Sequence, residues 1–296
     1  MNSGSPTRRI LIYMAAVLVA LFWFGPLVLV GVASMVPDGN LLSFPPRWFD
    51  NGIFFGNYEY ILTGVLPETY LQPGALRGAI SQEVRFVPQS LLNSFVIATA
   101  VALNNVVLGS LAAYAYARIR FPGRTLSFNF VLGSRLLPAV ALAVPFYTIV
   151  QRLGLLNSPI ALVLIYTVLT LPFSTLILTL HFRNIPQSID ESAQLEGAGP
   201  LRILWDIAVP LALPSLVGVG LFSFMLAYGE FLFALLIMTG SDTKTLPVLF
   251  GSLATNRDVA WGLLTASIIL GSLPTLVLVF PVWRFMVRDL TRGAER

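Results

Sequence analysis

The chain of 296 residues contains no cysteine, a single lysine and a single histidine. Without cysteine there is neither a disulfide framework nor a thiolate metal site. A phosphate loop for ATP hydrolysis needs a glycine-rich turn with its lysine, and the only lysine, Lys244, lies in no such motif. The lone His181 falls at the end of an apolar segment, where a histidine is far more often structural than catalytic. We therefore expect no catalytic residue, no metal site and no cofactor bound by this chain.

Charged residues are also scarce. They make up 11% of the chain, against roughly a quarter in soluble domains, while 56% of residues are hydrophobic. The mean hydropathy is +0.80. Such a composition indicates an integral membrane protein.

Six apolar segments exceed the roughly 20 residues that a helix needs to cross a bilayer. They cover residues 10–36, 91–117, 126–150, 159–182, 211–238 and 260–286. Strands of a membrane β-barrel are about ten residues of alternating polarity, which excludes a barrel. The predicted fold is an all-α membrane protein with six transmembrane helices. Its parts are an N-terminus 1–9, a first helix 10–36, an outer segment 37–90, a five-helix core 91–286 with an inner elbow 187–210, and a tail 287–296.

Basic residues set the orientation of membrane helices, because they concentrate on the cytoplasmic side. With the N-terminus inside, the inner segments hold eleven of them: Arg8, Arg9, Arg118, Arg120, Arg124, Arg183, Arg202, Arg284, Arg288, Arg292 and Arg296. The outer segments hold six: Arg47, Arg77, Arg85, Arg152, Lys244 and Arg257. Both termini are predicted to be cytoplasmic. This distribution also accounts for the net charge of +4 without any nucleic-acid partner.

A charged interval, Glu191–Pro210, separates two of the apolar segments. Ser188 and Glu191 stand at capping-box spacing, so a helix should begin at Ser188 and end at Gly197, whose freedom to adopt positive φ allows a sharp turn. Pro200 suits the first turn of a second helix. One face of that helix is predicted to be apolar, with Arg202 and Asp206 paired on another. The apolar positions are Leu201, Leu204, Trp205 and Ala208.

This elbow either lies among the lipid headgroups or contacts a protein. Its first half carries Asp190, Glu191 and Glu196 but no basic residue, which suits a negatively charged membrane surface poorly. A protein partner is therefore favoured over lipid.

The elbow resembles the EAA loop of permease subunits in ATP-binding-cassette importers. That pattern is Glu-Ala-Ala, three residues, Gly, nine residues, Ile, one residue, Leu-Pro. Here Glu191-Ser192-Ala193, Gly197, Ile207 and Val209-Pro210 match it without a gap, with Ser192 and Val209 as small departures. Further stretches resemble the carbohydrate branch, in the subunit similar to the second permease of maltose-type importers. They include Asn57-Tyr58, Leu92-Asn93-Ser94, Pro145-Phe146-Tyr147, Glu230-Phe231-Leu232-Phe233-Ala234 and Phe285–Ala294.

The resemblance covers nearly the whole chain and implies a type I importer permease with a cytoplasmic coupling helix in the bacterial inner membrane. Its implied partners are a second homologous permease, an ATPase dimer that binds ATP and Mg, and an external binding protein that delivers a sugar or related polyol. The implied ATPase-docking residues are Glu191, Ser192, Ala193, Gly197, Ala198, Ile207 and Pro210. The resemblance is weakest at residues 62–87, which make the first outer loop longer than is usual in the family, so no contact is carried over to them.

Two other functions stay open. An ion-coupled carrier acting alone would need ionisable groups within the membrane, for which Arg135 and Glu230 are the candidates, either paired or separate. An importer permease for polyamine, phosphate or sulfate would share the same elbow. For a polyol, hydroxyl, amide and aromatic groups suit hydrogen bonding and ring stacking. The predicted substrate pathway comprises Asn93, Arg135, Tyr147, Tyr228 and Glu230.

Overall fold

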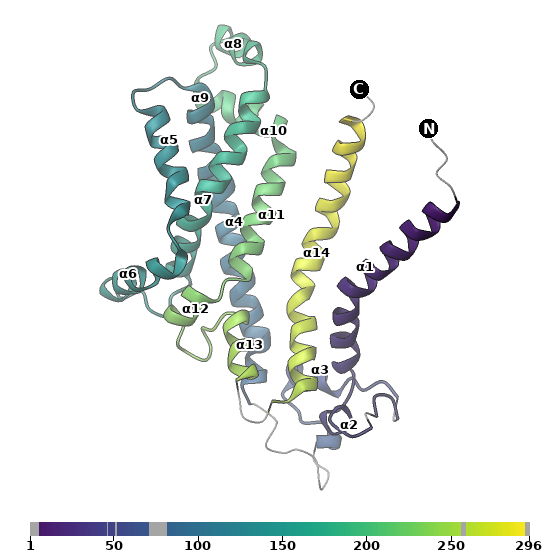
Figure 1. The fold of residues 1–296 in the computed structure, drawn as a ribbon. Coiled ribbons are helices and arrows are strands. Elements are labelled where there is room, and N and C mark those ends of the chain that lie inside the picture. The colour runs from purple at the N-terminus through teal and green to yellow at the C-terminus, as the bar shows by residue number, and fades with distance from the viewer. Residues whose placement is uncertain (1–5, 46, 51, 71–81, 256–258, 294–296) are drawn as a thin grey trace. The chain divides into compact units, whose positions relative to one another are not determined.

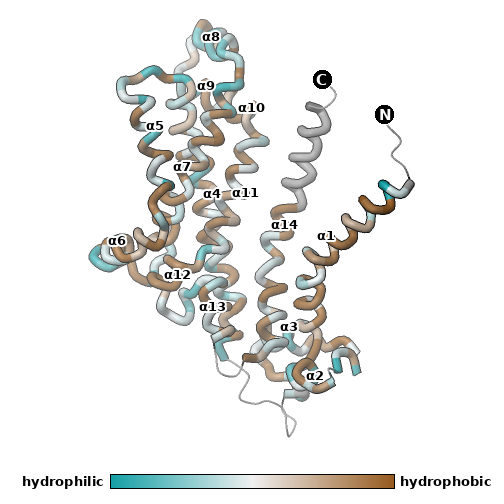
Figure 2. The backbone as a smooth tube through the Cα atoms, viewed as in Figure 1, coloured by the Kyte–Doolittle hydropathy of each residue, from teal (hydrophilic) through white to brown (hydrophobic). Residues whose placement is uncertain are grey.

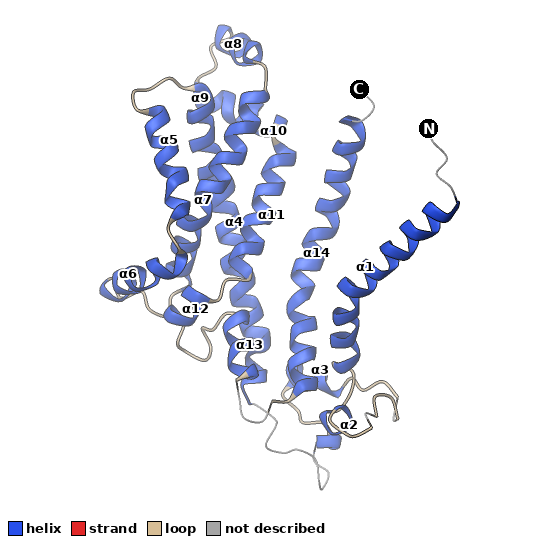
Figure 3. Ribbon diagram, viewed as in Figure 1, coloured by secondary structure: helices blue, strands red, loops and turns tan. Residues whose placement is uncertain are grey.

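The computed structural model describes the chain except residues 1–5, 46, 51, 71–81, 256–258 and 294–296 (Figure 1). The described part is helical and contains no strand (Figure 3). The chain divides into two compact units, Met1–Pro88 with Phe250–Ser272, and Gln89–Leu249 with Leu273–Arg296. Parts of three predicted regions, 1–9, 62–87 and 287–296, lie outside the described residues.

The first unit contains the N-terminal helix and the outer segment. Its helices are α1 (Pro6–Ala33), α2 (Asp38–Leu41), α3 (Gly56–Thr63), and the 3-10 turns η1 (Glu68–Tyr70) and η3 (Gln82–Phe86). Helix α13 (Leu246–Ala254) ends in this unit, and helix α14 (Trp261–Gly293) begins in it. The predicted first span thus ends at Ala33, three residues before the predicted 36.

The second unit holds the remaining helices. They are α4 (Val87–Arg118), α5 (Arg124–Gly133), η4 (Ser134–Leu136), α6 (Ala139–Arg152), α7 (Pro159–Asn184), α8 (Gln187–Leu195), α9 (Pro200–Ile203), the π-helical turn η5 (Leu204–Ala208), α10 (Val209–Leu211), α11 (Leu213–Tyr228) and α12 (Leu232–Ile237).

Four helices within the described residues are long and apolar enough to cross a membrane, and the number becomes six if two bent pairs each count as one span. The predicted span 126–150 is one of these pairs, because α5 with η4 and α6 meet at 99°. The bend is at Leu137, whose backbone is extended in front of Pro138, as steric conflict with a following proline favours. The second pair, Pro200–Leu211 with Leu213–Tyr228, is bent by 84° at the start of the predicted span 211–238. That predicted span is also interrupted where α11 ends at Tyr228, before α12 begins. Apolar residues cover most of the long helices (Figure 2).

Helices α4, α7 and α11 pack closely in the second unit. A Cβ atom added at Gly109 of α4 would lie 3.3 Å from Ser174 of α7, and one at Gly220 of α11 would lie 3.3 Å from Val106 of α4. Between α4 and α7, the Asn105 amide donates a hydrogen bond of 2.5 Å to Thr170. Small residues and interhelical hydrogen bonds are the usual means of packing helices within a bilayer, where burial from water contributes little.

A buried polar cluster joins the outer segment to the start of α14 in the first unit. Asp38 is only 2% exposed, and its Oδ1 accepts a hydrogen bond of 2.6 Å from the Gly262 amide. Asn57 donates to the carbonyls of Ser34 and Val36 at 2.9 and 3.1 Å. A Cβ added at Gly262 would lie 2.8 Å from both Asn57 Nδ2 and the Val36 carbonyl, so only glycine fits there.

Candidate functional site

The predicted elbow is present at the end of α7, with α8 and α9 joined by a turn (Figure 1). Gly197 has φ of +84°, the positive value that the sharp turn was predicted to need. Helix α8 begins at Gln187, one residue before the predicted Ser188. Pro186 precedes it with φ of −57° and ψ of 132°, and no side-chain hydrogen bond caps the helix, so the predicted capping box is wrong.

The second half of the elbow also differs from the expected amphipathic helix. Pro200 opens α9 as predicted, and Arg202 pairs with Asp206 at 3.3 Å. Leu201 and Trp205, however, are exposed, whereas Leu204 and Ala208 are buried. The π-helical turn adds residues per turn and so rotates the following side chains out of the regular 3.6-residue phase.

An apolar cluster attaches the inner side of the elbow to the helix bundle. It draws residues from α4, α7 and the chain between α9 and α11: Ala113, Tyr114, Ala117, Leu178, Phe182, Ile185, Ile203, Leu204, Ala208, Ala212, Leu216 and Val219. Ala193, Ala198 and Ile207 of the motif pack against it. Because these three contact the bundle, they hold the elbow in place from within.

The exposed side of the elbow carries the other motif residues. Glu191, Ser192, Gly197 and Pro210 are exposed. Leu195, which sequence reasoning did not select, is 91% exposed at the end of α8. Its signal was present in the sequence, since it is a lone leucine within the acidic half of the elbow. The structure therefore divides the predicted docking residues into an outward set and an inward set.

A buried ion pair ties the elbow to α4. Arg118 Nε lies 2.7 Å from Asp190 Oδ2, and both side chains are 9% exposed. A second nitrogen of the same guanidinium donates a hydrogen bond of 2.6 Å to the Ile185 carbonyl. From the sequence, Arg118 counts only among the basic residues of the inner segments and Asp190 among the acidic residues of the elbow, and their contact is not predicted.

Glu230 and Arg135, the two charges predicted to lie within the membrane, do not pair with each other. The Glu230 carboxylate accepts hydrogen bonds from the amides of Leu232, Phe233 and Ala234 at 2.8 to 3.4 Å, and from the Tyr166 hydroxyl at 2.6 Å. It thus satisfies the free amides at the start of α12, where a helix favours negative charge. Arg135 donates to the Leu169 carbonyl at 2.6 Å.

The other predicted pathway residues differ in their contacts and in their burial. The Asn93 amide donates to the carbonyls of Asp242 and Lys244 at 2.9 and 3.1 Å, so it anchors the loop before α13. Tyr228 is nearly buried and stacks on Phe224 with ring centroids 5.4 Å apart. Tyr147 is half-buried on α6. Among the described residues no group of His, Cys, Asp or Glu is arranged to hold a metal ion.

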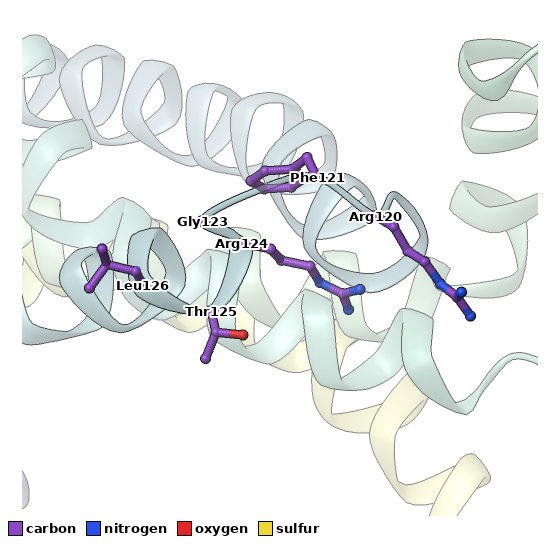
Figure 4. A pocket seen from close by; sticks show the side chains of 6 residues that line it. All are labelled: Arg120, Phe121, Gly123, Arg124, Thr125 and Leu126. Carbon is purple, nitrogen blue, oxygen red and sulfur yellow. The ribbon is translucent and has the colours of Figure 1, made fainter.

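An open hollow of about 510 Å³ lies at the turn between α4 and α5 (Figure 4). It is lined by Arg120, Phe121, Gly123, Arg124, Thr125 and Leu126. Gly123 has φ of +78°, which produces the tight turn that the Pro122-Gly123 pair predicts.

A family model described as "Binding-protein-dependent transport system inner membrane component" matches residues 105–288, well over half of the chain. The chain belongs to this family. The match includes the whole elbow, helices α7 and α11, and α4 from Asn105 onward, which together hold the apolar cluster. The protein is accordingly a membrane-embedded transport subunit of the importer permease kind.

Similar proteins extend the match to nearly the full length. The trehalose/maltose transport system permease protein MalG of Thermococcus litoralis is 32% identical over 290 residues, which cover 97% of this chain and 96% of that protein. The trehalose transport system permease protein SugB of Mycobacterium tuberculosis is 32% identical over 265 residues, 89% of this chain and 87% of that protein.

A solved structure shares the fold. A crystal structure of a bacterial ABC transporter involved in the import of the acidic polysaccharide alginate contains a chain with a TM-score of 0.73 to this one. The sequence identity is 20%, and the alignment covers 96% of this chain and 99% of that chain. The predicted fold class, a type I importer permease built of helices, is confirmed.

Proposed function

We propose that this permease translocates a sugar or related polyol, and that its elbow receives force from a separate ATPase. The observation that carries the proposal is the two-sided construction of the elbow. Its inner side is packed into the apolar cluster, and its outer side presents Glu191, Leu195 and the Gly197 turn. A surface built in this way suits a protein partner, because a displacement at the outer side passes to the membrane helices.

The energy source is proposed to be a partner ATPase dimer, which would bind ATP and Mg, because this chain has no phosphate-loop lysine. The outward carboxylate of Glu191 suits an arginine on that partner. The remaining proposed partners are a second homologous permease and an external binding protein. The excess of basic residues on the inner segments supports cytoplasmic termini.

An ion-coupled carrier acting alone receives less support. Such a carrier needs an intramembrane group that is free to exchange a proton or bind an ion. Glu230 is instead bonded to three amides and a tyrosine hydroxyl, and Arg135 to a backbone carbonyl. Neither side chain is therefore arranged to pass a proton or an ion along the membrane helices.

The sugar assignment is supported by the relatives, whose names specify trehalose and maltose transport. Of the predicted pathway residues, Tyr147 offers a half-buried ring and hydroxyl. Polyamine, phosphate or sulfate remains the second candidate class for the cargo. The ligand retained by the co-purified binding protein would separate the two.

The test is a charge reversal at Glu191 in the reconstituted complex. Glu191→Lys should leave the subunit in the membrane but reduce ATP-driven sugar uptake severely, because it places a cation against the proposed arginine. Gln187→Lys is the matched control, since it adds a lysine at an exposed position of the same helix but keeps Glu191. Normal uptake by Glu191→Lys would refute the docking assignment.

A further inference from the structure

The joint between α7 and α8 consists of two consecutive non-helical residues. Ile185 has ψ of 129° and Pro186 has ψ of 132°, so the helical hydrogen bonds of α7 do not continue into α8. A few extended residues at the end of an element are where proteins absorb hinge rotation. Through the backbone alone, α8 could swing about this joint without moving α7.

Arg118 spans this joint from outside. Its guanidinium contacts the Ile185 carbonyl within the joint and the Asp190 carboxylate after it, at 2.6 and 2.7 Å. Arg118 is itself the last residue of α4. One side chain thus connects α4, the joint that follows α7, and the first turn of α8.

We propose that Arg118 and Asp190 are positioning residues that clamp the elbow, so that a displacement of α8 reaches α4 and α7 together. The proposal rests on the proposed coupling function of the elbow and adds the residues through which the displacement is passed on. The apolar cluster alone would not be enough, because apolar contacts lack direction and permit sliding, whereas a guanidinium with two acceptors defines a direction.

Because the Arg118–Asp190 pair is buried, breaking it should cost enough free energy to be measured. Both side chains are 9% exposed, and removing one partner leaves the other as an uncompensated buried charge. The same elbow provides a natural comparison in Arg202–Asp206, an ion pair at 3.3 Å whose side chains are 74% and 63% exposed. Exposed pairs of this kind contribute little to stability.

The first measurement uses the chain alone and does not depend on any partner. Because the chain has no cysteine, spin labels can be placed at Ile119→Cys beside α4 and Leu195→Cys on α8, both exposed positions. Asp190→Asn should broaden the distance distribution between them, and Asp206→Asn should leave it unchanged. Equal distributions in all three proteins would overturn the clamp, whatever the protein transports.

The second measurement uses the complete complex and compares ATP hydrolysed per sugar imported, normalised to assembled complex. Asp190→Asn should raise this ratio about tenfold, while Asp206→Asn should change it by less than about twofold. The double variant Arg118→Met with Asp190→Leu removes both charges at similar volume, so it should assemble normally but remain uncoupled. A normal ratio in that double variant would show that the pair only stabilises the fold. If the wild-type complex shows no ATP-driven uptake, the proposed function fails, and the label distances still decide the clamp.

Discussion

The hydrogen bonds that the Glu230 carboxylate accepts at the start of α12 can be tested by substitution. Glu230→Gln keeps one acceptor oxygen but replaces the other with an amide group that donates. The Tyr166 hydroxyl, 2.6 Å from Oε2, and the Phe233 amide, 3.1 Å from it, would then face a donor. The substitution therefore removes hydrogen bonds and leaves their donors without an acceptor.

The size of the effect follows from those contacts. A hydrogen bond to a charged group contributes about 1.5–3 kcal/mol, and the negative charge at the start of α12 adds up to about 2 kcal/mol. Two such bonds, from Tyr166 and Phe233, are lost at Oε2, and because Glu230 is half-buried we expect the lower end of their sum, about 3 kcal/mol of unfolding free energy. That loss corresponds to a fall of about 6–12 °C in Tm for a protein of this size.

Thermal unfolding of the purified protein in detergent measures the effect. Tyr166→Phe removes one of the bonds and should lower Tm by about half as much. In a double-mutant cycle, the two substitutions should be non-additive by about 1 kcal/mol or more, because they share one contact. Tyr147→Phe is the matched control, since that hydroxyl has no hydrogen-bond partner among the described residues and its loss should leave Tm unchanged.

The same variant separates the two transport mechanisms. If Glu230 exchanged protons during transport, Glu230→Gln would abolish uptake driven by an ion gradient while Tm stayed near the wild-type value. A Tm within about 2 °C of the wild type would contradict the capping role assigned to Glu230.

Two further predictions concern the outer segment and the orientation. Burial raises the pKa of Asp38 to about 6, against the opposing hydrogen bond from Gly262, so the folded protein binds this proton more tightly than the unfolded chain. Unfolding free energy should therefore fall by about 3 kcal/mol as pH rises from 4 through 6, and Asp38→Asn should remove that part of the pH dependence of Tm. The orientation can be tested with single cysteines, because the chain has none of its own. Leu195→Cys should react with a membrane-impermeant thiol reagent only in inside-out vesicles, and Ile53→Cys only in right-side-out vesicles; both positions are exposed. The reverse pattern would overturn the predicted orientation.

The long helices and the elbow were predictable from the sequence because their signals are local. The length of an apolar run decides whether a helix can cross the bilayer, and Gly197 and Pro200 decide where the elbow turns and resumes. The predicted Arg202–Asp206 pair also depends only on helical spacing, and it is present. Proline is a local signal as well, and the predicted span 126–150 bends by 99° at Pro138.

The sequence alone determined the class of this protein: the helical membrane fold, the place of the elbow and the absence of a phosphate loop are properties of composition and spacing. Only the tertiary structure decided which elbow residues face outward, that Glu230 caps α12 beneath Tyr166, and that Arg118 reaches Asp190. The physical reason is that a pair so distant along the chain depends on which helices pack together. A pattern within one helix predicts its own periodicity but not the side chains that a neighbouring helix brings to it.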